Sequence, residues 1–219
     1  MMFRSALAAA IIFIAPAAAN AETAIFAGGC FWCVEDDMDH VKGVSSTISG
    51  YAGGTMANPT YEDHEGYTEA VKVEFDPAII SYAALTAHFL RTIDAVDGEG
   101  QFCDRGHSYI PALVPLTPEQ KQAGEAALAD AEKALGQKLA VAVIDTPSFF
   151  DAEDYHQNYH LGERITCCRA LASSSRRTPT NITRKAAAVL RASRRCGAMR
   201  PTPSRPAAGR AEPSLHRRA

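Results

Sequence analysis

Hydrophobic positions recur along the chain with the periods of strands and helices, and segments rich in Gly, Pro and Asn separate them. The run 69–75 alternates strictly and stops at Asp76-Pro77, which is typical of a half-buried strand. A capping box with proline at the first helical position, Thr117-Pro118-Glu119-Gln120, opens a helix. The pattern predicts strands over 23–27, 44–51, 69–75, 109–116 and 140–144, and helices over 30–38, 81–91 and 117–135.

The order of these elements indicates a fold class. It runs strand, helix, strand, strand, helix, strand, helix, strand, and its first six members match the split βαβ arrangement. We therefore expect an α+β fold, a two-layer sandwich with a ferredoxin-like (split βαβ) core. Pro111 interrupts the strand over 109–116, which favours an edge position for that strand. The long loops 52–66 and 94–107 are expected to carry function.

Residues 1–21 have the organisation of a secretory signal peptide. A short n-region with one positive charge, Met1–Arg4, precedes an apolar run over 6–14, and Ala19-Asn20-Ala21 is an A-x-A cleavage pattern. An uncleaved membrane anchor is disfavoured because the apolar run is too short to cross a bilayer. We expect the mature protein to begin near Glu22, to be periplasmic or secreted, and to have no membrane partner.

The two ends of the mature chain differ sharply in charge. Residues 22–163 carry 24 acidic and 7 basic side chains, whereas residues 164–219 carry 1 acidic and 14 basic ones. The basic segment is low in complexity, and it has too few large apolar residues to form a core, so we expect a disordered tail. A nucleic-acid-binding arm is the alternative, but no aromatic residues are interleaved with the arginines. We expect one domain over 22–163, a monomer, and no nucleic-acid partner.

Six cysteines, at 30, 33, 103, 167, 168 and 196, lie in the mature chain, but only three belong to the predicted domain. Three cysteines are too few for a small fold stabilised mainly by disulfides, so these cysteines are candidates for redox chemistry. Cys30 and Cys33 form a C-x-x-C at a predicted helix start, directly after Gly28-Gly29. Helix N–H groups there should lower the pKa of Cys30. A buried structural pair, half of a metal site and a thioredoxin-like oxidoreductase remain alternatives.

Further short motifs follow the stretch Gly28-Gly29-Cys30-Phe31-Trp32-Cys33 along the chain. They are Gly50-Tyr51-Ala52-Gly53-Gly54, Asn58-Pro59-Thr60-Tyr61, Glu69-Ala70-Val71, Asp76-Pro77, Asp104-Arg105-Gly106 and Ala152-Glu153-Asp154-Tyr155-His156-Gln157. In this order the set resembles the type A peptide methionine sulfoxide reductases, from about Ile25 to about His160. The resemblance implies an α+β sandwich with a ferredoxin-like core and thiol-dependent reduction of methionine-S-sulfoxide, free or in proteins.

The resemblance also implies roles for individual residues. The nucleophile falls on Cys30, the acid/base carboxylate on Glu69, and the supporting aspartate on Asp104. The residues that hold the substrate form two pairs: the oxygen-binding tyrosines Tyr61 and Tyr109, and the aromatics Phe31 and Trp32 against the methyl group. The histidines show no clean metal spacing, and no metal is expected.

The implied chemistry needs these side-chain types. A sulfoxide becomes electrophilic when its oxygen is protonated, and a carboxylic acid with a raised pKa can supply that proton. Thiolate attack then gives methionine and a cysteine sulfenic acid, which a second thiol converts to a disulfide. No cofactor is expected; an external dithiol reductant such as thioredoxin would restore the enzyme.

The chain departs from the family pattern at several places, among them a short loop between Tyr61 and Glu69. Tyr67 stands where the family usually has His, Ile110-Pro111 where it has Arg-Ser, and the basic tail replaces the usual C-terminal segment beyond Leu161. Two alternatives are therefore kept: a thioredoxin-like thiol-disulfide oxidoreductase, and an inactive reductase-like domain. Cys33 is predicted as the resolving cysteine because it lies three residues after Cys30 on the same helix face, and Cys103 is the reserve.

Overall fold

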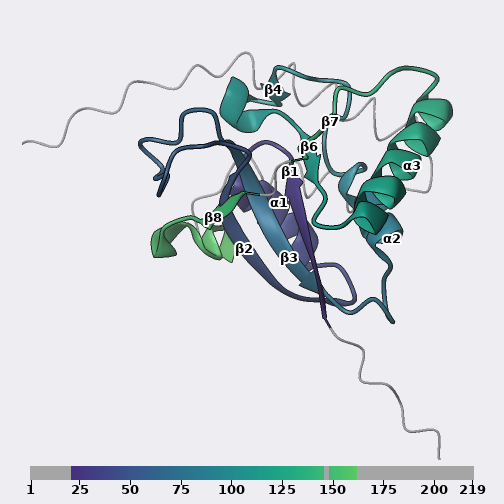
Figure 1. Cartoon of the computed structure of the whole chain (residues 1–219), viewed down its shortest axis with the longest axis horizontal. Coiled ribbons are helices and arrows are strands. Elements are labelled where there is room, and N and C mark those ends of the chain that lie inside the picture. The colour runs from purple at the N-terminus through teal and green to yellow at the C-terminus, as the bar shows by residue number, and fades with distance from the viewer. Residues whose placement is uncertain (1–20, 146–147, 162–219) are drawn as a thin grey trace, which may run out of the picture.

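A computed structural model describes residues 21–145 and 148–161 of the chain (Figure 1). The predicted signal peptide, apart from Ala21, lies outside the described residues, and so does the predicted tail. Among the described residues, no helix is both long enough and apolar enough to cross a membrane.

One mixed sheet organises the domain. Its six strands lie in the order β7 (Ala142–Val143), β6 (Ala112–Val114), β1 (Glu22–Ala27), β3 (Thr68–Phe75), β2 (Val44–Ala52) and β8 (Phe149–Asp151). Every neighbouring pair is antiparallel except β6 and β7, which run parallel. A separate two-stranded hairpin joins β4 (Gly100–Gln101) to β5 (Asp104–Arg105).

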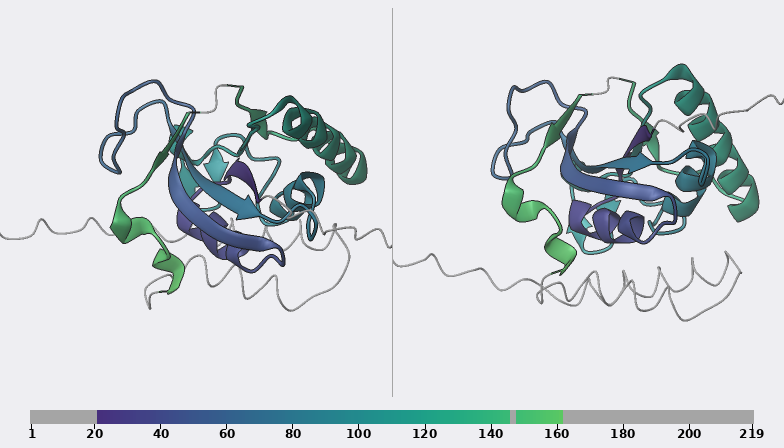
Figure 2. Two further views of the ribbon diagram at one scale, coloured as in Figure 1. Left: turned by 60° about the horizontal axis from the view of Figure 1, so that its bottom comes forward. Right: turned by 90° about the horizontal axis from the view of Figure 1, so that it is seen from below.

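Three helices connect these strands: α1 (Phe31–Asp39), α2 (Tyr82–Phe89) and α3 (Pro118–Leu135). The views in Figure 2 show α1 against one face of the curved sheet. Alternate residues of the central strands point to that face, where Phe26, Val71 and Val73 pack with α1 and α2 in the larger core. The opposite face carries a smaller apolar cluster around Ile25 and Ala70. The architecture is α+β, as predicted.

Capping residues mark where helices α2 and α3 begin and where α3 ends. The Ser81 hydroxyl accepts the Ala84 N–H (3.2 Å) at the start of α2, and the Thr117 hydroxyl accepts the Gln120 N–H (3.2 Å) at the start of α3. Helix α3 ends at Gly136, whose φ of 70° is left-handed. The predicted helix over 117–135 is therefore confirmed.

The prediction of an edge strand over 109–116 is wrong. Only Ala112–Val114 are extended, because His107–Tyr109 form a short 3-10 helix, η1. Strand β6 lies between β1 and β7 and begins at Ala112, after Pro111. Pro111 therefore contributes only its carbonyl, which accepts the Ala142 N–H at 3.0 Å. The strand predicted over 140–144 shortens to β7. Strands β4, β5 and β8 and the 3-10 helices η2 (Asp154–His156) and η3 (Tyr159–Leu161) were not predicted.

Candidate active site

The connection between β1 and α1 places Cys30 at the helix start. Gly29 has a left-handed φ of 86°, and a Cβ there would lie 2.5 Å from the Cβ of Gln101. Cys30 is the N-cap of α1, and its carbonyl accepts hydrogen bonds from the N–H groups of Cys33 and Val34 (3.0 and 3.3 Å). The glycine turn thus brings a cysteine to a helix N-terminus, in agreement with the sequence pattern.

Glu69 lies on β3 and is almost completely buried. Its Oε2 accepts a hydrogen bond from the N–H of Phe31, the residue after Cys30, at 2.9 Å. Burial raises the pKa of Glu69 to about 8; the Phe31 N–H lowers it and the charge of Asp104 raises it further. At neutral pH Glu69 therefore holds a proton, as a general acid must.

The thiol of Cys30 is not acidic in this state, and the prediction of a lowered pKa is wrong. Burial, followed by the charges of Glu69 and Asp104, raises the pKa of Cys30 to about 12. Backbone N–H groups of Cys33 and Trp32 lower it, but their effect is smaller than that of burial and the two carboxylates. Because Glu69 is itself protonated near neutral pH, part of this opposing charge is absent there.

The two predicted tyrosines and the aspartate reach the same place from three separate segments. Burial raises the pKa of Tyr61 and of Tyr109, and the nearby charges of Glu69, Asp104 and Cys30 raise both further. Burial also raises the pKa of Asp104. Tyr61 comes from the loop between β2 and β3, Asp104 from β5 and Tyr109 from η1. These mutual electrostatic effects indicate that the side chains of Cys30, Glu69, Tyr61, Asp104 and Tyr109 lie near one another.

The predicted aromatic pair forms one side of this site. Phe31 is fully buried, whereas Trp32 is partly exposed, and their rings lie 5.9 Å apart between centroids. Both stack loosely with Tyr61, at 6.4 and 6.5 Å. Trp32 is therefore the member of the pair with a solvent-accessible face. No group of three or more His, Cys, Asp or Glu side chains that could hold a metal ion occurs in the described part of the chain.

Comparisons with known proteins agree with this geometry. A family model described as peptide methionine sulfoxide reductase matches residues 22–187. The chain belongs to the peptide methionine sulfoxide reductase family. The match continues past residue 163, where the predicted domain ends.

Several relatives are similar to this reductase. Peptide methionine sulfoxide reductase MsrA 2 of Rhizobium meliloti (strain 1021) is 51% identical over 144 residues, which cover 65% of this chain and 73% of the relative. The protein of that name in Caulobacter vibrioides is 45% identical over 148 residues, or 65% of this chain and 75% of its own. The solved structure of methionine sulfoxide reductase A of Corynebacterium diphtheriae has a TM-score of 0.57 at 25% identity, covering 67% of this chain and 78% of its own.

Mxr1 from Saccharomyces cerevisiae in reduced form has a TM-score of 0.59 at 22% identity, over 75% of this chain and 91% of its own; it shares the fold. This structural similarity supports the α+β assignment. The relatives show that the chain is a type A reductase and an oxidoreductase that reduces methionine sulfoxide with thiols. A thioredoxin-like oxidoreductase, the alternative kept from the sequence, is not the family found.

The C-terminal part of the reductase contributes contacts that the sequence analysis did not assign. The Trp32 indole N–H donates to His156 Nδ1 at 3.2 Å, and the Trp32 ring stacks on Tyr159 with centroids 3.9 Å apart. Glu153 accepts the Tyr61 backbone N–H and the Tyr51 hydroxyl, both at 3.0 Å. Glu153 and His156 belong to the motif at 152–157, which was part of the family resemblance and could have pointed to them.

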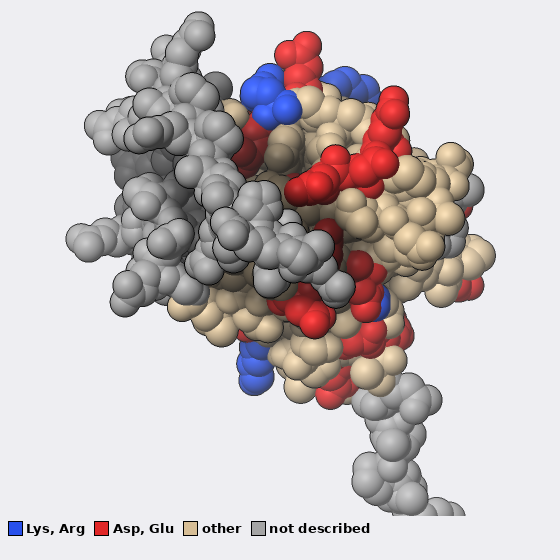
Figure 3. Space-filling view, turned by 90° about the vertical axis from the view of Figure 1, so that its left-hand side faces the viewer, with Lys and Arg blue, Asp and Glu red and all other residues tan. Residues whose placement is uncertain are grey.

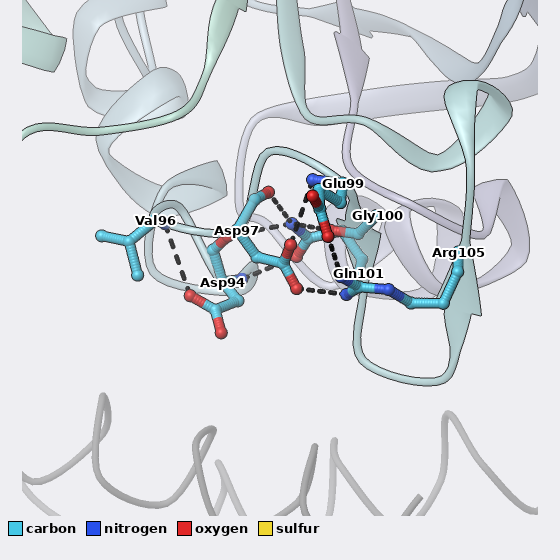
Figure 4. Close-up of polar contacts among 7 residues, drawn as sticks. All are labelled: Asp94, Val96, Asp97, Glu99, Gly100, Gln101 and Arg105. Atoms are coloured by element: carbon cyan, nitrogen blue, oxygen red, sulfur yellow. Dashed lines mark hydrogen bonds and ion pairs between the residues drawn. The ribbon is translucent and has the colours of Figure 1, made fainter. Parts of the chain in front are cut away.

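A buried glutamine holds the loop that carries Asp104 (Figure 4). The side-chain N–H groups of Gln101 donate to the carbonyls of Asp94 (2.9 Å), Asp97 (3.3 Å) and Gly100 (2.9 Å), and its oxygen accepts the Asp94 N–H at 2.7 Å. Arg105 pairs with Asp97 from the same loop. Because Gln101 also abuts Gly29, it connects this loop to the turn before Cys30.

The cysteines of the reductase differ in state. Cys30 is a free thiol, whereas Cys33 and Cys103 are both disulfide-bonded. Cys33 can therefore form a bond with Cys30 only after its present disulfide is reduced or exchanged. The assignment of Cys33 as the resolving residue, and of Cys103 as its reserve, stays a prediction.

Proposed function

We propose that this reductase acts on the S epimer of methionine sulfoxide, with Cys30 as nucleophile and Glu69 as general acid. The observation that carries the proposal is the buried Glu69 carboxyl, which has a pKa of about 8 and is hydrogen-bonded to the residue after Cys30. A neutral carboxylic acid beside a thiol is the pair that sulfoxide reduction needs.

In the proposed reaction, the Glu69 carboxyl and the Cys30 thiol are both protonated at the start. Glu69 donates its proton to the sulfoxide oxygen and then accepts the proton of the Cys30 thiol. The Cys30 sulfur attacks the activated sulfoxide, and the oxygen passes to Cys30 as a sulfenic acid while methionine leaves with the electron pair. The reaction is thus a two-electron oxidation of Cys30 and a two-electron reduction of the substrate. A thiol with a raised pKa is compatible with this sequence because its proton has an acceptor at the moment of attack.

The other predicted residues hold the substrate in this proposal. Tyr61 and Tyr109 donate hydrogen bonds to the sulfoxide oxygen and stabilise charge that builds there. Asp104 supports Glu69 electrostatically and keeps the pKa of that carboxyl raised. Trp32, backed by Phe31, contacts the methyl group. The same site would accept free or protein-bound methionine sulfoxide.

Regeneration requires a second thiol and an external reductant. We assign the second thiol to Cys33; once its present disulfide is reduced, this thiol condenses with the Cys30 sulfenic acid to a disulfide and water. A dithiol protein such as thioredoxin then reduces the disulfide, and no cofactor takes part. An inactive reductase-like domain is the rival interpretation kept from the sequence, and the family match as far as residue 187 counts against it.

Connectivity supports a ferredoxin-like core. Helix α1 joins β1 to β2, α2 lies between β3 and β6, and these four strands lie in the order β6, β1, β3, β2. This order is the one expected of a split βαβ arrangement, and it supports that part of the proposal. We assign the reductase domain to residues 22–163, as a monomer, and treat the basic segment 164–219 as lying outside it.

The location and partners are proposed from charge and sequence. The signal-peptide pattern of residues 1–21 supports export to the periplasm or beyond. Carboxylates outnumber Lys and Arg on the face drawn in Figure 3, which disfavours binding to nucleic-acid phosphates.

Stereospecific turnover tests the proposed function. Purified mature protein is given methionine-S-sulfoxide or methionine-R-sulfoxide with dithiothreitol, and methionine is measured. We expect turnover of the S epimer alone and no turnover by the Cys30→Ser variant. Equal turnover of both epimers, or none of either by folded protein, would contradict the proposal.

A further inference from the structure

One side-chain hydrogen bond joins the two segments that carry Tyr61 and Tyr109. His64 Nε2 lies 3.0 Å from the hydroxyl oxygen of Ser108. His64 is three residues after Tyr61 in the loop between β2 and β3, and Ser108 directly precedes Tyr109 in η1. A contact between residues 44 positions apart thus lies next to both tyrosines.

The His64 ring is held in a defined orientation. Its Nδ1 lies 3.0 Å from the Thr60 carbonyl oxygen, which can only accept, so Nδ1 carries the hydrogen. In the neutral ring Nε2 is then an acceptor, and the Ser108 O–H donates to it. The ring also stacks on Tyr51, with centroids 5.0 Å apart and planes 19° apart. The Thr60 carbonyl and the rings of Tyr51 and Tyr61 therefore surround the ring that receives the Ser108 hydroxyl; the Tyr61 centroid lies 6.3 Å away.

The loop itself is held on its other side. The Glu153 carboxylate accepts the Tyr61 N–H at 3.0 Å, which ties the Tyr61 backbone to η2. The Tyr61 side chain is nevertheless 38% exposed, so packing alone does not fix its hydroxyl. The His64–Ser108 hydrogen bond connects this loop to η1, which contains Tyr109.

We propose that the His64–Ser108 hydrogen bond positions Tyr61 relative to Tyr109, so that both hydroxyls reach one sulfoxide oxygen. His64 and Ser108 are positioning residues here, acting through the two tyrosines. The inference rests on the proposed function, in which those tyrosines hold the oxygen. Two donors that converge on one atom must both keep hydrogen-bond geometry as charge develops, so a small change in their separation slows the reaction.

Ser108→Ala and Ser108→Thr form the first test. Ser108→Ala removes the donor, and we expect the single-turnover rate of methionine-S-sulfoxide reduction to fall about 3–10-fold, the effect of one modest hydrogen bond. Ser108→Thr keeps a hydroxyl and should recover most of the rate. His64→Phe keeps an aromatic ring against Tyr51 and should match Ser108→Ala. His40→Ala is the control, because within the described residues the polar contacts of the His40 ring are with Asp36 of its own helix, at the backbone carbonyl and the carboxylate.

The decisive test removes the two hydroxyls on which the bond is meant to act. In a Tyr61→Phe/Tyr109→Phe background, adding Ser108→Ala should cause no further loss of rate. A further loss of the same size there, with unchanged thermal unfolding, would overturn the inference because the bond would then act elsewhere. So would a wild-type rate for Ser108→Ala when the double Phe variant is slow. If the double Phe variant is as fast as wild type, the proposed oxygen-binding role itself has failed, and the inference fails with it.

Discussion

The Glu69 carboxylate accepts a hydrogen bond from the backbone N–H of Phe31, at 2.9 Å from Oε2. This contact spans 38 residues and joins the central strand β3 to the first turn of α1, where Cys30 lies. It fixes the proposed acid beside the nucleophile through backbone geometry. Substitutions at the Phe31 side chain therefore leave this hydrogen bond in place.

The raised pKa of Glu69 predicts a pH dependence of stability. Its folded value of about 8 lies above the usual 4.5, so the folded state binds more protons between those values. Its contribution to stability is complete below about pH 4.5 and is lost as the pH rises through about 8, with a slope of at most about 1.4 kcal/mol per pH unit.

Urea unfolding of wild type and Glu69→Gln at about pH 5.5 and about pH 7.5 measures this effect. Other buried carboxyls, such as Asp104, contribute in both proteins, so the difference between the two proteins isolates Glu69. Wild type should lose more stability than Glu69→Gln over this interval. Equal losses would show that Glu69 is ionised throughout the range.

Gly29→Ala should destabilise the domain more than Gly66→Ala. Both glycines have left-handed φ angles, 86° and 79°, so each substitution pays a backbone cost of about 1–2 kcal/mol. At Gly29 the new Cβ would also meet the Gln101 side chain at 2.5 Å, whereas nothing lies within 4 Å of it at Gly66. Chemical denaturation measures both variants, and a Gly29→Ala loss no larger than that of Gly66→Ala contradicts the packing described here.

Features set by neighbouring residues could be predicted from the sequence, whereas features set by contacts between distant residues could not. The glycine turn before Cys30 and the capping box at Thr117 are local signals, and both predicted their helices. The Cys30 pKa was mispredicted because the helix N-terminus is visible in sequence, while burial and the Glu69 charge arise only in the folded domain. The Tyr61–Glu153 bond joins residues 92 positions apart, and no periodicity could indicate it.

Cys30→Ser should abolish reduction, because a hydroxyl cannot form the sulfenic acid intermediate. Methionine formation and sulfenic acid trapping by dimedone with mass spectrometry, after one equivalent of sulfoxide, check both halves of the claim. A Cys33→Ser variant, which lacks the proposed resolving thiol, should give one dimedone adduct, on Cys30. Any methionine formed by Cys30→Ser assigns the chemistry to another thiol.

Oxidised protein should contain a Cys30–Cys33 disulfide. The prereduced protein is treated with one equivalent of methionine-S-sulfoxide without further reductant, and peptide mass mapping identifies the pair. Prereduction is required because Cys33 is disulfide-bonded in the described state. Truncation after Leu161 should leave this bond intact if the domain still folds. Finding Cys30 joined to Cys167 or Cys168 instead would place the resolving thiol in the C-terminal segment, and a bond to Cys103 would place it beside Asp104.

The most direct test of the account is the pH dependence of the single-turnover rate in wild type and Glu69→Gln. The reactive state proposed here has both Cys30 and Glu69 protonated, so the wild-type rate should be level near neutral pH and fall as the pH rises through about 8. Glu69→Gln keeps the shape and loses the proton; its rate should be lower by roughly 10²–10⁴-fold and lack that falling limb. A Glu69→Gln rate equal to wild type, or a wild-type rate that rises through pH 8, would contradict general acid catalysis by Glu69.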